Sequence, residues 1–203
     1  PEYQKKIVPG WIAPNKGTPD YFNKCSDKNA GVPYNFAGCI NANSGNAYAG
    51  IILRQFFKEN LLHNNITKRE SREYLQAKLK NKLKKDSVYE IKLYYCLASK
   101  SKYSVDRLGI FISKEKIKSK DKKRFWFVPQ IRSMTGVSLN NRDEWKELKG
   151  TYKAKGGEEY ITIGNFYSNS ETKTVRACKD ADANNYSYYY IDDVSVKLIS
   201  KDQ

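Results

Sequence analysis

Few residues of this sequence have the types and spacing that catalysis requires. The only histidine, His63, stands in LLHNNIT just before a predicted helix, where a polar role in a loop is favoured over general-base chemistry. The acid pairs Asp192–Asp193 and Glu158–Glu159 are neighbours that would point to opposite faces, whereas a glycosidase needs two carboxylates about 5–9.5 Å apart across a cleft. No GxSxG, HExxH or phosphate-binding glycine loop occurs. The sequence therefore predicts a protein that is not an enzyme.

Aromatic side chains offer a different chemistry, because an exposed ring can stack on a sugar face while a few polar groups fix the orientation. We predict four aromatic ligand-binding residues: Trp11, Tyr21, Tyr34 and Trp126. The first three lie in an irregular segment, where packing in a core is less demanding. The fourth alternates with Phe125 and Phe127, so that either it or this pair faces outward. For each ring, packing in the core is the alternative.

Four cysteines, at positions 25, 39, 96 and 178, form no CxxC motif and no cluster with histidine, so zinc is not expected. Cys25 and Cys39 bracket the loop CSDKNAGVPYNFAGC, which a disulfide would close easily and usefully in an exported protein. We predict this disulfide, with two free thiols as the alternative. Cys96 falls within a predicted strand and is expected to pack as a small apolar residue.

The charge of the chain is strongly positive and unevenly distributed. The 37 basic and 22 acidic residues give a net charge of +15, and the segment from Lys68 to Arg124 holds 19 basic against 7 acidic residues, a surplus of 12. Such a segment could attract nucleic acid, an anionic lipid surface or an acidic polysaccharide. Lysine predominates, however, which favours a solvated face, and the segment lacks the interleaved aromatic residues of RNA-binding folds. We do not expect a nucleic-acid partner.

The elements that must position these residues are mainly strands. With 16 tyrosines and 13% aromatic residues, the composition favours β-structure, and 203 residues suit one domain. Period-two alternation and turn residues predict strands at 47–53, 87–98, 106–113, 124–131, 145–154, 159–166, 172–177 and 188–199. Residues 1–46 are irregular. We therefore predict an all-β fold, an antiparallel β-sandwich of jelly-roll type.

One short helix is predicted at residues 67–83. Leu75, Leu79 and Leu83 recur every four residues among good helix formers, and Thr67 with Glu70 matches a capping box. No run approaches the roughly 20 apolar residues of a membrane-spanning helix. The chain starts at Pro1 without a methionine or a visible signal peptide, so we interpret it as a piece of a longer protein.

From Trp145 onward the sequence resembles a known family. The pattern W–KG–Y–AKGGEEYITIGNF followed by YYYIDDVSV, together with GWIAPNKGTPDYFNKC, GVPYNFAG and SGNAYAGI, resembles the carbohydrate-binding-module-like jelly rolls with a galactose-binding-like fold. The variant it is most similar to occurs in exported surface proteins of Bacteroidetes-type bacteria, often ahead of an OmpA-like domain. Family members usually start with a strand N-L-V-x-N-x-x-F-E, which this sequence lacks. The resemblance covers most of the chain, and we predict that residues 1–203 form one domain.

The resemblance implies a function, a location and a metal. It implies a non-catalytic module that binds a glycan or polysaccharide at the bacterial cell surface, outer membrane or periplasm. The alternative is a structural module that contacts other envelope proteins during secretion or gliding-associated assembly. It also implies a structural calcium held by Asp192, which alternation places with Tyr190, Val194 and Val196 on the presumed inner face. The alternative for Asp192 and Asp193 is pairing with lysines at a strand edge.

Overall fold

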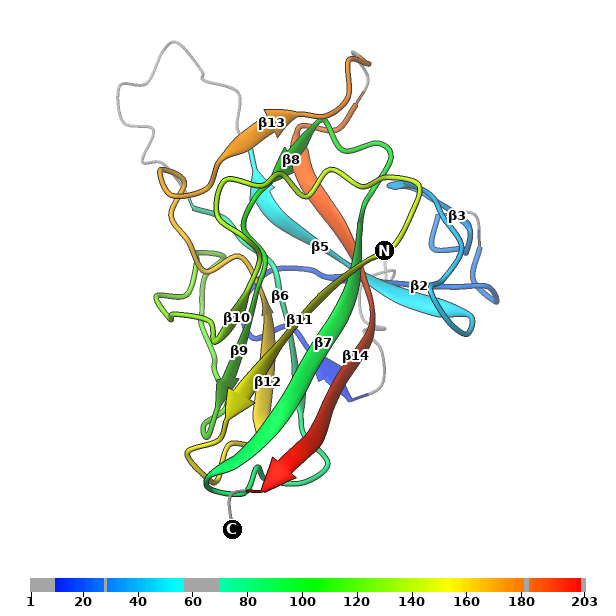
Figure 1. Cartoon of the computed structure of the whole chain (residues 1–203). Coiled ribbons are helices and arrows are strands. Elements are labelled where there is room, and N and C mark those ends of the chain that lie inside the picture. The colour runs from blue at the N-terminus through cyan, green and yellow to red at the C-terminus, as the bar shows by residue number, and fades with distance from the viewer. Residues whose placement is uncertain (1–9, 28, 57–69, 181–182, 202–203) are drawn as a thin grey trace.

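The computed structural model describes residues 10–27, 29–56, 70–180 and 183–201, and it shows two antiparallel five-stranded sheets packed face to face (Figure 1). In the first sheet the strand order is β1 (Trp11–Ile12), β6 (Tyr74–Lys78), β12 (Tyr160–Gly164), β9 (Gly109–Ser113) and β10 (Ile131–Arg132). In the second it is β11 (Lys146–Lys153), β7 (Ser87–Leu97), β14 (Tyr186–Lys201), β5 (Ala47–Gln55) and β2 (Asp20–Asn23). We call them sheet A and sheet B.

Two short strand pairs complete the described elements. β3 (Tyr34–Asn35) pairs with β4 (Gly38–Cys39), and β8 (Tyr103–Val105) pairs with β13 (Thr174–Arg176). The predicted all-β antiparallel sandwich is therefore confirmed. No helix among the described residues is long and apolar enough to span a membrane.

The main core lies between the two sheets and follows from strand alternation. On β7 the odd-numbered residues are buried and belong to this core, while even-numbered residues such as Lys92 and Tyr94 lie on the other face. Ile91 and Leu93 are fully buried. Burying one such side chain stabilises the fold by about 1.5–3 kcal/mol relative to leaving it exposed. The alternation read from the sequence of this strand is thus confirmed.

A second cluster covers the outer face of sheet B. Tyr188 and Tyr190 on β14 and Tyr48 on β5 pack there against Phe22 of β2 and the loop that carries β3 and β4. Gly50 allows this packing, because a Cβ at that position would lie 2.1 Å from Tyr188 Oη. The segment predicted to be irregular therefore contains the short strands β1 to β4, and its residues 20–42 form the lid of a second small core.

The helix predicted at residues 67–83 is wrong for the part that the structure describes, and Thr67 lies outside it. Residues 74–78 form β6, which pairs with both β1 and β12. A spacing of four residues is a multiple of two as well as close to one helical turn, so the leucines fitted either period. Tyr74, the neighbour of Leu75, is buried as well. Adjacent residues of a strand point to opposite faces, so both are buried because β6 is covered on both faces.

The strand predicted at residues 124–131 is also largely wrong. Only Ile131 and Arg132 form a strand, β10, and the preceding residues belong to a connector, residues 114–130, between β9 and β10. Ile117 and Phe125 of this connector pack with Tyr74 and Phe166 in a third apolar cluster. The connector is held on the fold by these buried side chains, by an isolated bridge between Ser71 and Lys123 and by backbone hydrogen bonds, rather than by a continuous strand ladder. The other predicted strands are present, with shifted ends.

Candidate functional site

The four predicted aromatic residues lie on four different elements. Trp126 on the connector and Tyr34 on β3 are exposed, by 80% and 70% respectively. Trp11 on β1 is half-buried against the main core, and Tyr21 on β2 is half-buried with its hydroxyl accepting a hydrogen bond from Asn23 Nδ2 at 2.7 Å. The structure therefore does not gather them into one surface, and two of them face solvent.

Trp126 has the most developed surroundings. The guanidinium carbon of Arg124 lies 3.3 Å from the centroid of the Trp126 ring, which is a cation–π contact. Arg124 is itself fixed, because it pairs with the carboxylate of Glu70 and donates a hydrogen bond to the carbonyl of Phe166 at 3.4 Å. One face of the indole is thus backed by a positioned cation.

The backbone next to Trp126 is anchored as well. The Phe125 ring is buried against Tyr74, with 4.6 Å between the centroids, and the Phe125 N–H donates to Tyr74 Oη at 3.0 Å. Tyr74 Oη in turn donates to the carbonyl of Asn165 at 2.7 Å. Because Phe125 points inward, the adjacent Trp126 must point outward.

The apolar surface continues beyond Trp126. Phe127 is 41% exposed and stacks on Phe111 of β9, with 4.7 Å between ring centroids and 16° between ring planes. Val128 follows and is also exposed. We call Phe111, Arg124, Trp126, Phe127 and Val128 the aromatic platform. A tryptophan this exposed, on a fixed backbone and next in sequence to a partly exposed phenylalanine, is suited to contact with a flat apolar partner.

Electrostatics near the platform favour the ionised form of Glu70. Burial of the Glu70 carboxyl opposes ionisation, but hydrogen bonds from the Asn169 N–H at 2.7 Å and from Arg124 outweigh it and lower its pKa. Glu70 therefore stays ionised at neutral pH and keeps its ion pair with Arg124, which lies over the indole.

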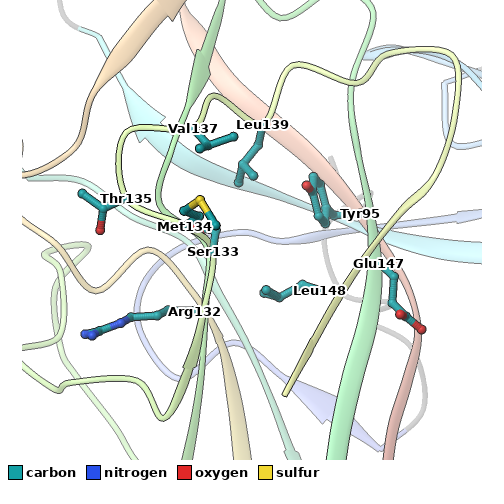
Figure 2. Close-up of a pocket in the computed structure, with 9 residues that line it drawn as sticks. All are labelled: Tyr95, Arg132, Ser133, Met134, Thr135, Val137, Leu139, Glu147 and Leu148. Atoms are coloured by element: carbon teal, nitrogen blue, oxygen red, sulfur yellow. The ribbon is translucent and has the colours of Figure 1, made fainter. Parts of the chain in front are cut away.

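A pocket of 480 Å³ lies at the edge of the sandwich, away from the four predicted residues (Figure 2). Tyr95 and Leu148 form its apolar wall, Met134 stands at its mouth, and Arg132 and Glu147 lie on opposite sides of it. Of the residues that line it, only Glu147 carries a carboxylate. The pocket therefore lacks the carboxylate pair of a glycosidase.

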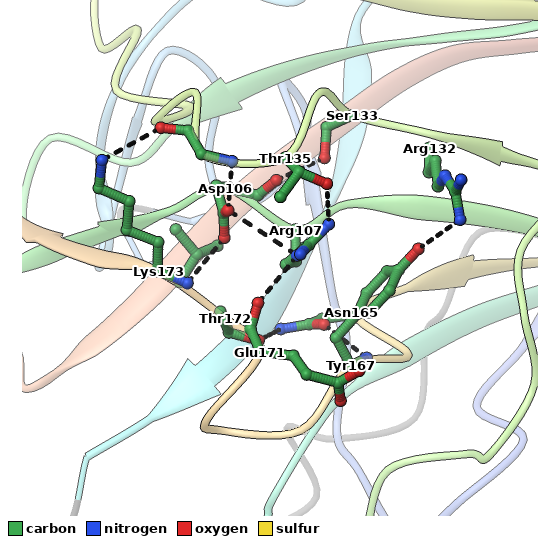
Figure 3. A network of polar contacts seen from close by, with 12 residues as sticks. Asp106, Arg107, Arg132, Ser133, Thr135, Asn165, Tyr167, Glu171, Thr172 and Lys173 are labelled. Carbon is green, nitrogen blue, oxygen red and sulfur yellow. Dashed lines mark hydrogen bonds and ion pairs between the residues drawn. The ribbon is translucent and has the colours of Figure 1, made fainter.

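The loop that forms the mouth of this pocket is held by a polar network (Figure 3). The buried carboxylate of Asp106 accepts hydrogen bonds from the Gly136 N–H at 2.7 Å and the Lys173 N–H at 2.8 Å. Arg107 donates to Thr135 and lies 4.4 Å from the centroid of the Tyr167 ring. Asp106 thus holds backbone N–H groups of this network, and Arg107 holds Thr135. These hydrogen bonds give both residues a structural role.

Asp192 does not lie where alternation placed it. β14 contains a β-bulge at this point, with a register shift between Asp192 and Ser195, and Asp193 has a φ of 46°. Tyr190 therefore packs on the outer face of sheet B, whereas Val194 and Val196 pack against the main core. The prediction that Tyr190, Val194 and Val196 share one face is wrong, because the bulge reverses the alternation.

The two aspartates hold a turn. Asp192 Oδ2 accepts the Asn43 N–H at 2.9 Å and the Ser44 N–H at 3.5 Å, and Asp192 Oδ1 accepts the Asp193 N–H at 2.8 Å. Asp193 accepts hydrogen bonds from the side chains of Asn43 and Ser44. Burial raises the pKa of the Asp192 carboxyl, although the backbone hydrogen bonds that it accepts lower it. None of the ion pairs between described residues involves either aspartate, so the predicted alternative of pairing with lysines is absent there.

The surroundings of Asp192 do not fit the calcium that the resemblance implied. Calcium takes six to eight oxygen ligands, whereas both oxygens of this carboxylate face N–H donors. Within the described ranges, no group of three acidic, histidine or cysteine side chains could hold a metal ion. The calcium stays a prediction that this geometry does not support.

The structure differs from the predicted disulfide. Cys25 and Cys39 are free and exposed. Cys25 follows the turn after β2, where its N–H donates to Asn23 Oδ1 at 2.8 Å, and Cys39 pairs with Tyr34 in the small β3–β4 ladder. Each cysteine is thus fixed by local backbone contacts of its own. Cys96 is buried, as expected, and burial raises the pKa of its thiol to about 12.

Sequence reasoning missed Arg124 as the partner of Trp126 and Phe111 as the partner of Phe127, and it missed the pocket. The alternation in RFWFV correctly opposes Trp126 to Phe125. It did not show that Phe127 leaves the core, because that depends on the connector not being a strand. His63 lies outside the described residues.

Comparisons with known proteins support the fold. No protein-family model matches the sequence, and no curated protein matches it either. Among solved structures, the tandem CBM22 domain of Paenibacillus barcinonensis Xyn10C is 12% identical, with a TM-score of 0.50, over 97% of this chain and 48% of that chain. This chain therefore spans about half of that tandem. The likeness shows a carbohydrate-binding-module-like β-sandwich, as the sequence resemblance implied.

Two further solved structures are similar. The first xylan-binding CBM22 domain of the same Xyn10C is 14% identical, with a TM-score of 0.47, over 99% of this chain and 92% of that chain. A cleaved adhesin domain of Lys-gingipain from Porphyromonas gingivalis is 12% identical, with a TM-score of 0.49, over 98% and 96%.

Proposed function

We propose that this protein is a non-catalytic glycan-binding module that holds a sugar chain against the aromatic platform. The observation that carries the proposal is the Trp126 ring, 80% exposed on an anchored backbone and backed by Arg124. Exposing so large an apolar ring costs free energy unless a partner covers it, and sugar faces stack well on such rings. The fold adds support only as an analogy, because one fold hosts many functions.

The absence of catalysis is part of the proposal. The pocket at the sandwich edge has a single lining carboxylate, and the buried Asp106 is engaged by backbone N–H groups. From the sequence resemblance alone, we further propose that the module acts in an exported protein at the bacterial cell surface or elsewhere in the envelope.

The alternative is a module for protein–protein contacts in envelope assembly. It is favoured by Met134 and Val137, which are exposed on one loop that lines the edge pocket and are not part of the platform. Exposed aliphatic side chains suit a protein partner better than a sugar.

The test compares two exposed aromatic residues on different elements. A glycan array identifies a ligand for the unaltered protein, and calorimetry then measures Trp126→Ala and, as the matched control, Tyr34→Ala. We expect Trp126→Ala to weaken binding by about 1–3 kcal/mol, as loss of a central aromatic contact does, and Tyr34→Ala to leave it unchanged. Both variants should keep the melting temperature, because both side chains are exposed.

Two outcomes would count against the platform. Loss of binding in Tyr34→Ala but not in Trp126→Ala would move the site to the β3–β4 side of the molecule. A glycan array without any signal for the unaltered protein would favour the assembly alternative.

A further inference from the structure

A groove of 570 Å³ runs between residues 12–15 and the first half of the connector, where Lys116, Lys118 and Lys120 line it. Backbone hydrogen bonds join its two walls. The Ser119 N–H donates to the Pro14 carbonyl at 2.8 Å, and the Lys16 N–H donates to the Asp121 carbonyl at 2.9 Å. We call it the lysine groove, and its shape is set by these contacts.

The three lysines are turned outward by their neighbour Ile117. Ile117 is buried in the cluster with Tyr74, whereas Lys116, Lys118 and Lys120 are exposed. None of the ion pairs between described residues includes any of the three. The nearby carboxylate of Asp121 closes its own turn, accepting hydrogen bonds from the Lys123 N–H at 2.8 Å and Ser119 Oγ at 3.1 Å. The positive charge of the groove is therefore available to a ligand.

The opposite wall of the groove is apolar. Ile12, Ala13 and Pro14 form most of it, together with Asn15, and none of the described residues that line the groove is aromatic. An apolar wall opposite a row of cations suits a ligand ring whose face contacts the apolar wall and whose edge carries a negative group that meets the cations. Single-stranded nucleic acid would instead require aromatic rings on which its bases can stack.

We propose that the lysine groove binds the carboxylate or sulfate groups of an anionic polysaccharide. The inference rests on the proposed function and specifies its ligand class: the glycan is acidic. The groove lysines and Trp126 lie on one connector, and the six residue steps from Lys120 to Trp126 span at most about 22 Å. A polysaccharide of several sugar units could therefore reach both.

The test uses four polymers at 150 mM salt: polygalacturonate, dextran sulfate, carboxyl-reduced polygalacturonate and duplex DNA. The groove variant is Lys116→Gln, Lys118→Gln and Lys120→Gln combined. The matched control is Lys24→Gln, Lys100→Gln and Lys155→Gln combined, three exposed lysines outside the groove lining. Both lower the net charge from +15 by 3, to +12, so non-specific attraction falls equally in both.

We expect the unaltered protein to bind an acidic polysaccharide at least tenfold more tightly than the neutral polymer, and the groove variant to lose about tenfold while the control loses less than twofold. Polygalacturonate and dextran sulfate then show whether carboxylate or sulfate is preferred. Equal losses in both variants would overturn the inference, as would DNA binding that is as tight and as dependent on the groove lysines.

Failure of the inference differs from failure of the proposed function. If the neutral polymer binds with full dependence on Trp126 and charge adds nothing, the glycan-binding proposal stands and the acidic ligand is rejected. If an acidic polymer binds with dependence on the groove lysines but Trp126→Ala does not weaken its binding, the platform is rejected and the groove is supported.

Discussion

Burial changes the ionisation of single residues in this fold, and Asp20 is an example. Burial raises the pKa of its carboxyl from 3.8 to about 6, although the hydrogen bond that Tyr188 Oη donates to it at 2.6 Å lowers the pKa, and the charge of Glu73 raises it further. The folded state therefore binds a proton more readily than the unfolded chain. Stability that depends on this proton is present at low pH and is lost as the pH rises through about 6.

Asp20→Asn should remove this pH dependence while keeping an oxygen that can accept the Tyr188 hydrogen bond. Urea unfolding at pH 5 and pH 7 measures it. From pH 5 to pH 7, we expect the free energy of unfolding of the unaltered protein to fall by about 1 kcal/mol more than that of the variant. Burial also raises the pKa of Glu73, which titrates in the same direction in both proteins, so only the difference between them reports on Asp20. An identical pH dependence would contradict the assignment.

Among the elements, β14 depends on its bulge to meet the turn at Asn43 and Ser44. The left-handed backbone of Asp193, at φ 46°, brings two consecutive carboxylates to one turn, which a regular strand would send to opposite faces. Aspartate tolerates this conformation better than most residues with a Cβ. The acids thus join the middle of one long strand to the loop before β5.

Asp192→Ala should lower the free energy of unfolding by about 0.5–1.5 kcal/mol, because it removes the acceptor of the exposed Asn43 N–H and of the part-buried Asp193 N–H. Thermal unfolding is measured in calcium and in chelator, with Asp27→Ala as a control that removes an exposed carboxylate with local bonds only. We expect the loss to be the same in both solutions. A calcium-dependent rise in melting temperature that Asp192→Ala abolishes would restore the metal role implied by the resemblance.

The whole molecule is joined by β14, which contributes to two cores. Tyr189 and Ile191 belong to the core between the sheets, whereas Tyr188 and Tyr190 belong to the cluster on the outer face of sheet B. The N-terminal lid is therefore packed on the same strand that closes the sandwich. We expect lid and sandwich to unfold together.

Phe22→Ala tests this coupling, because Phe22 is fully buried in the lid cluster and contacts Tyr188 and Tyr190. The free energy of unfolding of the variant should be lower by about 3–5 kcal/mol. Circular dichroism and tryptophan fluorescence should still report one unfolding transition in urea. Leu93→Ala, in the main core, is the matched control and should behave alike with a loss of about 2–5 kcal/mol. Separate transitions in Phe22→Ala would show that the lid unfolds independently.

The sequence by itself determined the fold class and most strands. Alternation depends only on which residues must leave water, so the inward-facing residues of β7 and the opposite directions of Trp126 and Phe125 could be read directly, although not which of the two faces outward. The burial of Cys96 was expected from its apolar character within a predicted strand. These features follow from the chemistry of neighbouring residues.

Only the tertiary structure decided the identity of β6, the path of the connector and the partners of the aspartates. Leucines four residues apart fit a helix and a strand equally, and the two flanking strands of sheet A selected the strand. The bulge at Asp193 and the cation behind Trp126 bring together residues far apart in the chain, such as Asp192 with Asn43 and Arg124 with Glu70. Local periodicity cannot predict such contacts, because their free energy comes from segments that meet only when the two sheets close on a common core.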